Sequence, residues 1–328
     1  MKNRAVLFFL FTLMIVVSLS SCGKSKVDEK SFFLMDTIVT VKSADVSDEL
    51  VWQCEDRIYE IESAISKTAK ESDVYKFNRS DESLDLSSDS AELISRVLSL
   101  CPVVNGAYDP TLASVSELWD ITGEARIPKD NEISDALLHT GYQKLSLDGS
   151  SLSKSDPELK LDLGGAGKGY ACEKAVELLS ASDGYGLVSF GSSIGVFGNK
   201  PDEEPWNIAI TDPYDPSSTV GYVSIESGYV TVSGDYERYA EIDGVRYSHI
   251  IDPKTGRPLS NGVHSVVIIS DDAVVGDVLS TALMIAGEEG ITEFKNAGIE
   301  FEALMISDRG YMMTDNMKEI LTLYEEKK

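Results

Sequence analysis

The chain has 328 residues, of which 42% are hydrophobic, so it can bury the core of one large domain or two ordinary ones. Its 29 basic and 55 acidic side chains give a formal net charge of −26 at pH 7. So acidic a chain repels nucleic-acid phosphates, which argues against a nucleic-acid-binding protein.

The N-terminal residues have the pattern of an export signal. Lys2 and Arg4 precede the apolar run AVLFFLFTLMIVV, which is short for a membrane span. The next residues, SLSSC, resemble a bacterial lipobox that ends at Cys22. We therefore predict a lipoprotein signal peptide at residues 1–21. An ordinary cleaved signal with an incidental cysteine is the alternative.

Lipidation of Cys22 would anchor the mature protein outside the cytoplasm on the bacterial cell membrane, because acyl chains bury enough methylene groups to hold it there. Residues 22–30 are then predicted to be a tether, and residues 31–328 a single folded domain. The three remaining cysteines show no CxxC spacing, so neither a disulfide framework nor a zinc site is indicated.

The first half of the folded part is predicted to mix helices and strands. Apolar residues recur with helical or alternating spacing, a capping pattern runs from Asp89 to Glu92, and Asp148 and Gly149 are turn residues. The predicted elements are a strand over 31–43, helices over 47–67 and 89–104, and a hairpin within 144–163.

The second half is predicted to be mostly strands, separated by Gly, Asp and Pro turns. The Asp243-Gly244 pair is a strong hairpin signal, and a late helix over 272–287 ends at Gly287. Without a repeat or a clear domain boundary, the chain is predicted to be α+β, with helices packed against mostly antiparallel or mixed sheets.

The segment LDLGGAGKGYACEKAVELL (161–179) places four glycines and Lys168 between a strand-like and a helix-like run. A glycine loop before a helix N-terminus suggests an anion site. Neither nucleotide motif fits, because no register supplies GxGxxG and Lys168 is followed by Gly169 rather than Ser or Thr.

Asp277 and Thr281 lie four residues apart in the late helix, and therefore on one helix face. Their oxygens suit a hard cation such as Mg²⁺. The same spacing also suits a Thr281 hydroxyl that bonds back to the Asp277 carbonyl, with no metal present.

Three other candidates lie at turns, where functional side chains gather. His249 stands between a strand and a Pro/Gly turn, Asp109 lies within NGAYDPT, and Ser233 begins a small-residue bend. Each also has a purely structural interpretation as a turn or strand-end residue.

Seven segments together resemble one protein family. In chain order they are MDT, NGAYDPT, LDLGGAGKGYACEKA, FGSSIG, VSGDYERY, YSHIIDPKTGRPL and GDVLSTALMIAG. This order is similar to that of the ApbE family of FAD:protein FMN transferases, from about Met35 to the C-terminal strands. The HIIDPxTG block combined with the D-x-x-x-T helix makes the resemblance specific.

The resemblance implies a T-fold-like α+β protein that binds FAD and a divalent metal, here Mg²⁺. Asp277, Thr281 and the backbone carbonyl of Gly165 would hold the metal. His249 and Asp277 would be the catalytic residues, with His249 acting as a base or only as a hydrogen-bonding partner of phosphate. The residues implied to contact FAD are Met35 at the adenine end, Thr68, Ala107, Tyr108, Asp109, Asp162, Lys168 and Ile251.

Three departures from the family pattern affect the expected FAD contacts. Asp36 stands where MGT is common, and Ser192 and Ser193 stand where the family often has paired glycines. Near Thr68, many members carry an aromatic residue that covers the flavin.

The implied activity is transfer of FMN from FAD to a Thr or Ser hydroxyl of a target protein, with release of AMP. Two alternatives stay open: hydrolysis of FAD to FMN and AMP in the same site, and a lipid-anchored flavin-binding protein without catalysis. Asp277, Thr281 and Lys168 argue against pure binding, since a binder needs no metal pair. The implied targets are flavin-carrying subunits of membrane redox pumps or extracellular reductases.

Overall fold

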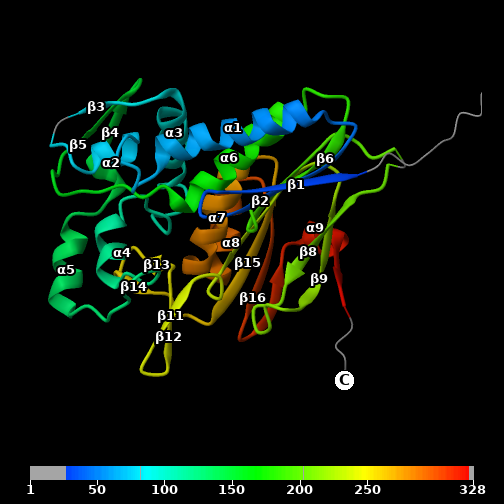
Figure 1. Ribbon diagram of the computed structural model, residues 1–328. Coiled ribbons are helices and arrows are strands. Elements are labelled where there is room, and N and C mark those ends of the chain that lie inside the picture. The colour runs from blue at the N-terminus through cyan, green and yellow to red at the C-terminus, as the bar shows by residue number, and fades with distance from the viewer. Residues whose placement is uncertain (1–26, 82, 202, 325–328) are drawn as a thin grey trace, which may run out of the picture.

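The computed structural model describes residues 27–81, 83–201 and 203–324, and an eight-stranded sheet forms its centre (Figure 1). The strand order is β1-β2-β6-β7-β10-β15-β16-β17, and every neighbouring pair is antiparallel. The strands are β1 (Asp28–Leu34), β2 (Thr37–Ala44), β6 (Tyr185–Ser189), β7 (Ser193–Phe197), β10 (Gly228–Gly234), β15 (Val263–Ser270), β16 (Glu302–Ser307) and β17 (Gly310–Met313).

Helices cover one face of this sheet (Figure 1). α7 packs on β10 and β15, and α6 packs on β7, on α7 and on α1. The described part of the chain contains α1 (Asp48–Ile65), α2 (Asp73–Phe77), α3 (Ser88–Leu100), α4 (Ala113–Trp119), α5 (Asp130–Leu138), α6 (Gly164–Leu179), α7 (Ala273–Ala286), α8 (Glu288–Asn296) and α9 (Asp315–Ile320), with a 3₁₀ turn at Tyr142–Lys144. Of these, α9 lies on the opposite face of the sheet, where it contacts β16.

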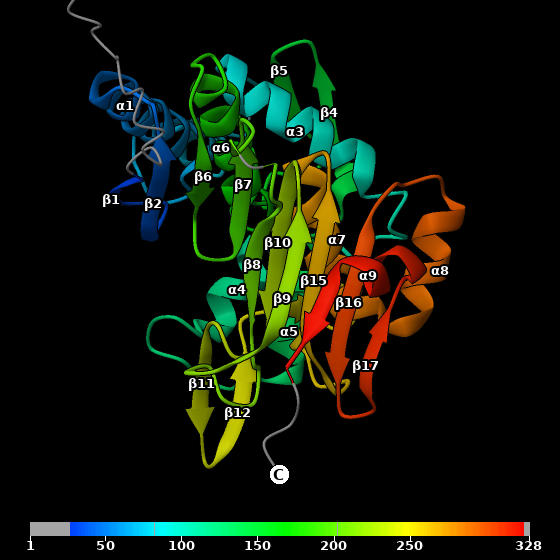
Figure 2. The ribbon, with the colours of Figure 1, turned by 90° about the vertical axis from the view of Figure 1, so that its right-hand side faces the viewer.

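A smaller sheet, in the order β18-β9-β8, lies over the opposite face (Figure 2). Its strands are β8 (Trp206–Thr211), β9 (Thr219–Ile225) and β18 (Leu321–Leu323). Ile208 and Val223 pack there against Val230 and Val267 of the central sheet. β15 is thus covered on both faces, which is why its sequence VHSVVIIS is almost continuously apolar.

Smaller elements surround this layered core. They are the sheet β3 (Leu84–Asp85), β5 (Ser151–Lys154) and β4 (Leu145–Asp148), the hairpin β11 (Tyr239–Ile242) and β12 (Val245–Ser248), and the pair β13 (Ile251–Asp252) and β14 (Arg257–Pro258). Trp119 of α4 and Ile133 of α5 pack with Ile251 in a third apolar cluster. The β11–β12 hairpin projects beyond it (Figures 1 and 2).

The predicted α+β class is confirmed, as are the hairpins turned at Gly149 and Gly244 and the helix that ends at Gly287. The helix predicted over 47–67 is α1, whose residues Val51, Cys54, Ile58, Ile61 and Ile65 are buried. Helical spacing of apolar residues identified it because one face of the helix covers the sheet.

The strand predicted over 31–43 is wrong in one respect, because it is a hairpin. Met35 and Asp36 form its turn with φ of +56° and +54°. No Gly or Asn marks this turn, so the usual hairpin signal is absent. β1 also begins at Asp28, and residues 28–30 therefore belong to a strand rather than to the predicted tether.

The predicted glycine loop is the start of a helix. α6 begins at Gly164, so the four glycines and Lys168 lie inside its first turns and do not precede its N-terminus. The capping prediction at Asp89 is also wrong, because Ser87 is the N-cap of α3 and accepts from the Ser90 amide. The charged C-terminal segment contains α9 and β18.

Cys54, Cys101 and Cys172 are buried free thiols. No helix in the described part of the chain is both long and apolar enough to cross a membrane. The signal peptide predicted at residues 1–21 and the lipidation at Cys22 lie outside the described residues, and these stay predictions.

Candidate active site

Asp277 joins three elements beneath the start of α6. Its side chain on α7 accepts a hydrogen bond of 2.8 Å from the Ser193 hydroxyl of β7 and one of 2.6 Å from the Gly169 amide of α6. The residue is only 7% exposed. Burial raises the pKa of Asp277, while the charge of Lys168 and the two hydrogen-bond donors oppose this shift.

The glycines of α6 are required by close packing. A Cβ at Gly169 would lie 2.3 Å from the Ala273 carbonyl oxygen, so only glycine lets α6 approach α7 this closely. A Cβ at Gly165 would lie 2.8 Å from the Tyr108 ring. These contacts bring the Gly165 backbone, Tyr108 and Asp277 to one end of the two helices.

Lys168 points from α6 to the loop between β6 and β7, where it donates to the Ser192 hydroxyl. The same loop lies beside the β1–β2 turn, since a Cβ at Gly191 would be 3.5 Å from the Thr37 hydroxyl. The Met35 methyl group in that turn would lie 3.5 Å from a Cβ at Gly167. The MDT, FGSS and glycine segments therefore meet, as the family resemblance implies.

Thr281 lies one helical turn beyond Asp277, on the same helix face. Its hydroxyl is 3.3 Å from the Ser233 hydroxyl of β10. The hydroxyl that bonds back to the Asp277 carbonyl belongs to Ser280, at 3.0 Å. The alternative role considered for Thr281 is therefore filled by its neighbour.

His249 follows β12 and is half-buried. Its backbone amide and its Nδ1 each lie 3.0 Å from the Arg238 carbonyl oxygen. Because a carbonyl oxygen only accepts, we assign the proton of the neutral ring to Nδ1, which leaves Nε2 with a free lone pair. Burial lowers the pKa of His249 to about 4, and the charges of Arg238 and Lys168 act in the same direction.

The predicted FAD residues around Tyr108 differ in their contacts. Tyr108 and Ala107 are buried beside α6, and burial raises the pKa of the Tyr108 hydroxyl. Asp109 instead accepts from the amide and hydroxyl of Thr111, at 2.8 and 2.6 Å, and from the Tyr142 amide at 3.1 Å. Its carboxylate holds its own turn together, as the structural interpretation of that residue suggested.

Asp162 and Thr68 are connected through Lys67. One oxygen of Asp162 accepts from the Gly164 amide at the start of α6, and the other lies 2.5 Å from the Lys67 ammonium. Thr68 is exposed, and its hydroxyl is 3.1 Å from that of Ser66. These two predicted FAD residues therefore share one rim of the candidate site.

Ile251 is the predicted FAD residue whose side chain points elsewhere. It is 8% exposed and packs with Trp119 in the third apolar cluster. The Trp119 indole also donates to the Gly256 carbonyl at 2.8 Å, which fixes the turn after Ile251. Any flavin contact of this strand would come from its backbone.

Sequence reasoning did not assign the hydrogen-bond partners that orient the predicted residues. Ser193 binds Asp277, Ser192 binds Lys168, Ser233 meets Thr281, and the Arg238 carbonyl fixes His249. All lie at or next to strand ends, within segments that resemble the family. The small polar residues beside glycine were the available signal, but their partners are distant in sequence.

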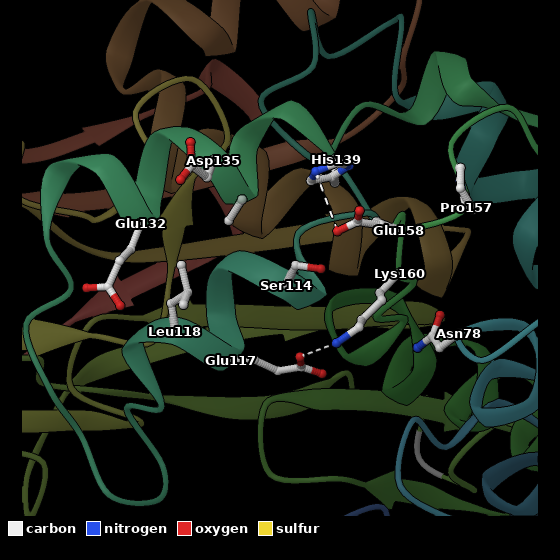
Figure 3. A pocket seen from close by; sticks show the side chains of 11 residues that line it. Asn78, Ser114, Glu117, Leu118, Glu132, Asp135, His139, Pro157, Glu158 and Lys160 are labelled. Atoms are coloured by element: carbon white, nitrogen blue, oxygen red, sulfur yellow. Dashed lines mark hydrogen bonds and ion pairs between the residues drawn. The ribbon is translucent and has the colours of Figure 1, made fainter.

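A separate pocket of about 580 Å³ lies between α4, α5 and residues 157–160 (Figure 3). None of the predicted site residues lines it. Its charged side chains are mainly carboxylates, including Glu117, Glu132 and Asp135, and Lys160 is already paired with Glu117 at 2.6 Å. An acidic lining disfavours phosphate, so this pocket is a poor candidate for the FAD site.

The residues around Asp277 fit a magnesium ion. Within 27–81, 83–201 and 203–324, no three or more His, Cys, Asp and Glu side chains are grouped to hold a metal. A cation beside Asp277 would rely on one carboxylate and on neutral oxygens of Thr281 and Gly165. Mg²⁺ accepts such a set, because it often takes one or two carboxylates and completes its shell with water and substrate phosphates.

Comparison with known proteins identifies the fold and its family. The model of the ApbE family matches residues 35–305. The chain belongs to the ApbE family. This ApbE-family protein is 34% identical to the FAD:protein FMN transferase of Vibrio cholerae over 259 residues, which cover 76% of this chain and 77% of that protein. It is 33% identical to the Escherichia coli K12 enzyme of the same name over 242 residues, or 70% and 68% of the two chains.

Two solved structures support the same assignment. The ApbE protein of Thermotoga maritima superposes with a TM-score of 0.84 at 32% identity, covering 90% of the present ApbE-family chain and 99% of that chain. The flavinyl transferase ApbE of Pseudomonas stutzeri, in its apo form, gives 0.80 at 30% identity, with 91% and 98% covered. The predicted family, fold and transferase class are confirmed.

Proposed function

We propose that this ApbE-family enzyme transfers FMN from FAD to a Ser or Thr hydroxyl of an acceptor protein. The bond that breaks joins the FMN phosphorus to the bridging oxygen of the FAD pyrophosphate, so AMP leaves. The observation that carries the proposal is the convergence of Lys168, Asp277 and the Gly165 backbone where α6 meets α7. This arrangement suits phosphoryl transfer, which mainly needs positioning and charge neutralisation.

Each polar residue of the site has a distinct task in this reaction. Lys168 supplies a cation close to Asp277 and His249, where the pyrophosphate would lie. His249, neutral above about pH 4, offers its Nε2 lone pair to the acceptor hydroxyl. Met35 is half-buried beside α6 and gives apolar surface on which a ring of FAD would pack, while the buried Tyr108 supports the start of α6 from beneath.

We further propose that Mg²⁺ binds at Asp277, Thr281 and the Gly165 carbonyl. In a helix that carbonyl would accept from the Gly169 amide, and this amide is engaged by Asp277, which favours the carbonyl as a ligand. Bound Mg²⁺ would neutralise pyrophosphate charge and stabilise the leaving AMP. Ser193 keeps the Asp277 carboxylate in place through its 2.8 Å hydrogen bond.

The decisive experiment is incubation of the protein with FAD, Mg²⁺ and a candidate flavin-carrying acceptor. Intact-protein mass spectrometry should reveal acceptor that has gained one FMN, and chromatography should reveal one AMP for each FMN transferred. AMP and free FMN without modified acceptor would instead indicate FAD hydrolysis. Absence of both products, with FAD bound and several acceptors tried, would refute the proposal.

The location of the enzyme is a separate proposal. The LSSC segment supports lipidation at Cys22, with the folded part held outside the cytoplasm. Acceptors would then be domains of membrane redox proteins or extracellular reductases that face the same compartment.

A further inference from the structure

His264 occupies an irregularity of the central sheet. In the β15–β16 ladder Val263 pairs with Ser307 and Ser265 with Ile306, so His264 is an extra residue in a β-bulge. Bulges re-aim a side chain and often lie next to active sites. Here the bulge turns His264 away from the ladder and towards the loop that follows β10.

Two hydrogen bonds join this bulge to that loop. The Asp235 amide donates to the His264 carbonyl at 3.1 Å, and His264 Nδ1 lies 2.8 Å from the Asp235 carboxylate. The β10–β15 ladder ends one residue earlier, with Gly234 opposite Ser265. The two hydrogen bonds between His264 and Asp235 therefore continue the connection between β10 and β15 by one residue, into the loop at 235–238.

The other ring nitrogen of His264 has its own carboxylate. Nε2 lies 2.9 Å from Asp308 in the β16–β17 turn, and the Tyr214 ring packs edge-on at 5.1 Å. Among the described residues, Asp235, Asp308 and Tyr214 are the titratable groups in contact with the His264 ring, and Asp212 and Tyr311 lie near Tyr214. A ring bound to a carboxylate at each nitrogen donates to both only when it is protonated.

The loop at 235–238, which His264 binds through Asp235, also orients the candidate base His249. Three residues after Asp235, the Arg238 carbonyl accepts from the His249 amide and from its Nδ1. Asp235 is thus bonded to the sheet at one end of a four-residue loop, and His249 is oriented at the other end. A shift of this loop would move the acceptor that sets the His249 ring.

We propose that His264 is a positioning residue, which in its protonated form clamps the loop at 235–238 and thereby orients His249 for FMN transfer. This inference rests on the proposed function. Burial lowers the pKa of His264, but the carboxylates of Asp308 and Asp235 outweigh this effect and raise the pKa above the ordinary value near 6.5. The clamp is therefore complete below that raised pKa and loses one of its two donors as the pH rises through it.

The test measures kcat for FMN transfer between pH 6 and 9 and, separately, the histidine ring signals by NMR. The chain has only three histidines, so these signals can be assigned by substitution. In the wild type we expect kcat to fall about five- to tenfold as His264 loses its proton, with the KM for FAD unchanged. The His249 ring signals should change at the same pH.

Three variants make the assignment specific. His264→Gln should give a pH-independent kcat near the low value, while His264→Lys, which stays charged, should keep the higher value at pH 8.5. Asp308→Asn removes one carboxylate and should move the fall in kcat to lower pH. The matched control is His139→Gln, because His139 pairs with Asp156 at 3.1 Å beside the remote pocket, and it should leave the profile unchanged.

The outcomes separate this inference from the proposed function. If no FMN is transferred at any pH but the His249 signals still follow His264, the proposed function fails and the clamp stands. If transfer occurs and His264→Gln keeps the wild-type profile, or the His249 signals ignore His264, the clamp is wrong. Thermal unfolding of each variant at pH 6.5 identifies any that fails to fold, and the wild-type NMR titration then decides.

Discussion

Replacing Asp277 by Asn should separate the chemistry of the site from its stability. Asn has nearly the same shape, so its Oδ1 can still accept from the Gly169 amide and its Nδ2 can donate to the Ser193 hydroxyl. Both hydrogen bonds survive, and a buried negative charge is removed. We expect Asp277→Asn to change the free energy of unfolding by less than about 1 kcal/mol, in the stabilising direction.

The same substitution should abolish most activity, because it removes the carboxylate that we propose as a ligand of Mg²⁺. We expect kcat for FMN transfer to fall about 10²–10³-fold, the usual loss for a group that stabilises transition-state charge. Added Mg²⁺ should raise the Tm of the wild type with FAD bound, and should leave the Tm of Asp277→Asn unchanged.

The pH dependence of stability gives a further check on Asp277. Its raised pKa means that the folded state binds a proton more tightly than the unfolded state. The carboxylate therefore costs stability above this folded pKa and costs nothing below about pH 4. The advantage of Asp277→Asn should vanish in acid. Magnesium-stimulated turnover within threefold of wild type, or a loss of several kcal/mol in unfolding, would refute the assigned role.

The other predictions concern residues around the same site. His249→Gln should lower kcat at least about 100-fold, and the acid limb of the wild-type pH–rate profile should lie near pH 4 because the neutral ring is the base; a limb near 6.5 would contradict this. Gly169→Ala should cost roughly 2–4 kcal/mol in chemical denaturation, since its Cβ would lie 2.3 Å from the Ala273 oxygen; an unchanged midpoint would mean that α6 and α7 separate easily. Lys168→Met should weaken FAD binding about tenfold in calorimetry and leave riboflavin binding unchanged, and equal losses for both would exclude a phosphate contact. Cys22→Ser should move the protein out of the membrane fraction, and persistent membrane association would argue against a lipid anchor.

The sequence predicted the helices and hairpin turns that are determined by the spacing of neighbouring residues. The buried positions of α1 recur every three or four residues, and the Asp243-Gly244 turn has φ of +52° and +77°, as its residues favour. The start of α6 does not follow from propensity, because glycine disfavours helices. Gly169 is helical because α7 approaches there and Asp277 binds its amide, and both partners are about a hundred residues away.

For the candidate site too, the sequence predicted individual residues and did not predict the contacts between them. Helical spacing placed Asp277 and Thr281 on one face, and the family motifs singled out His249 and Lys168. The orienting contacts depend on which strand ends meet in three dimensions, so single-chain patterns gave no partner for Ser193. The bulge at His264 has no sequence signal at all, since it arises from a shift in pairing between β15 and β16.

Chemical labelling of the three buried thiols can be used to follow local unfolding of the protein. Cys54, Cys101 and Cys172 come from α1, the end of α3 and α6, and burial raises the pKa of the first two thiols to about 12. Only the thiolate reacts with alkylating agents, and at pH 7 roughly one such thiol in 10⁵ is ionised. Labelling of these three buried cysteines therefore requires local opening of the packing between the helices and the sheet. The rate at which a maleimide marks each cysteine would measure how often that layer opens, residue by residue, with no engineered probe.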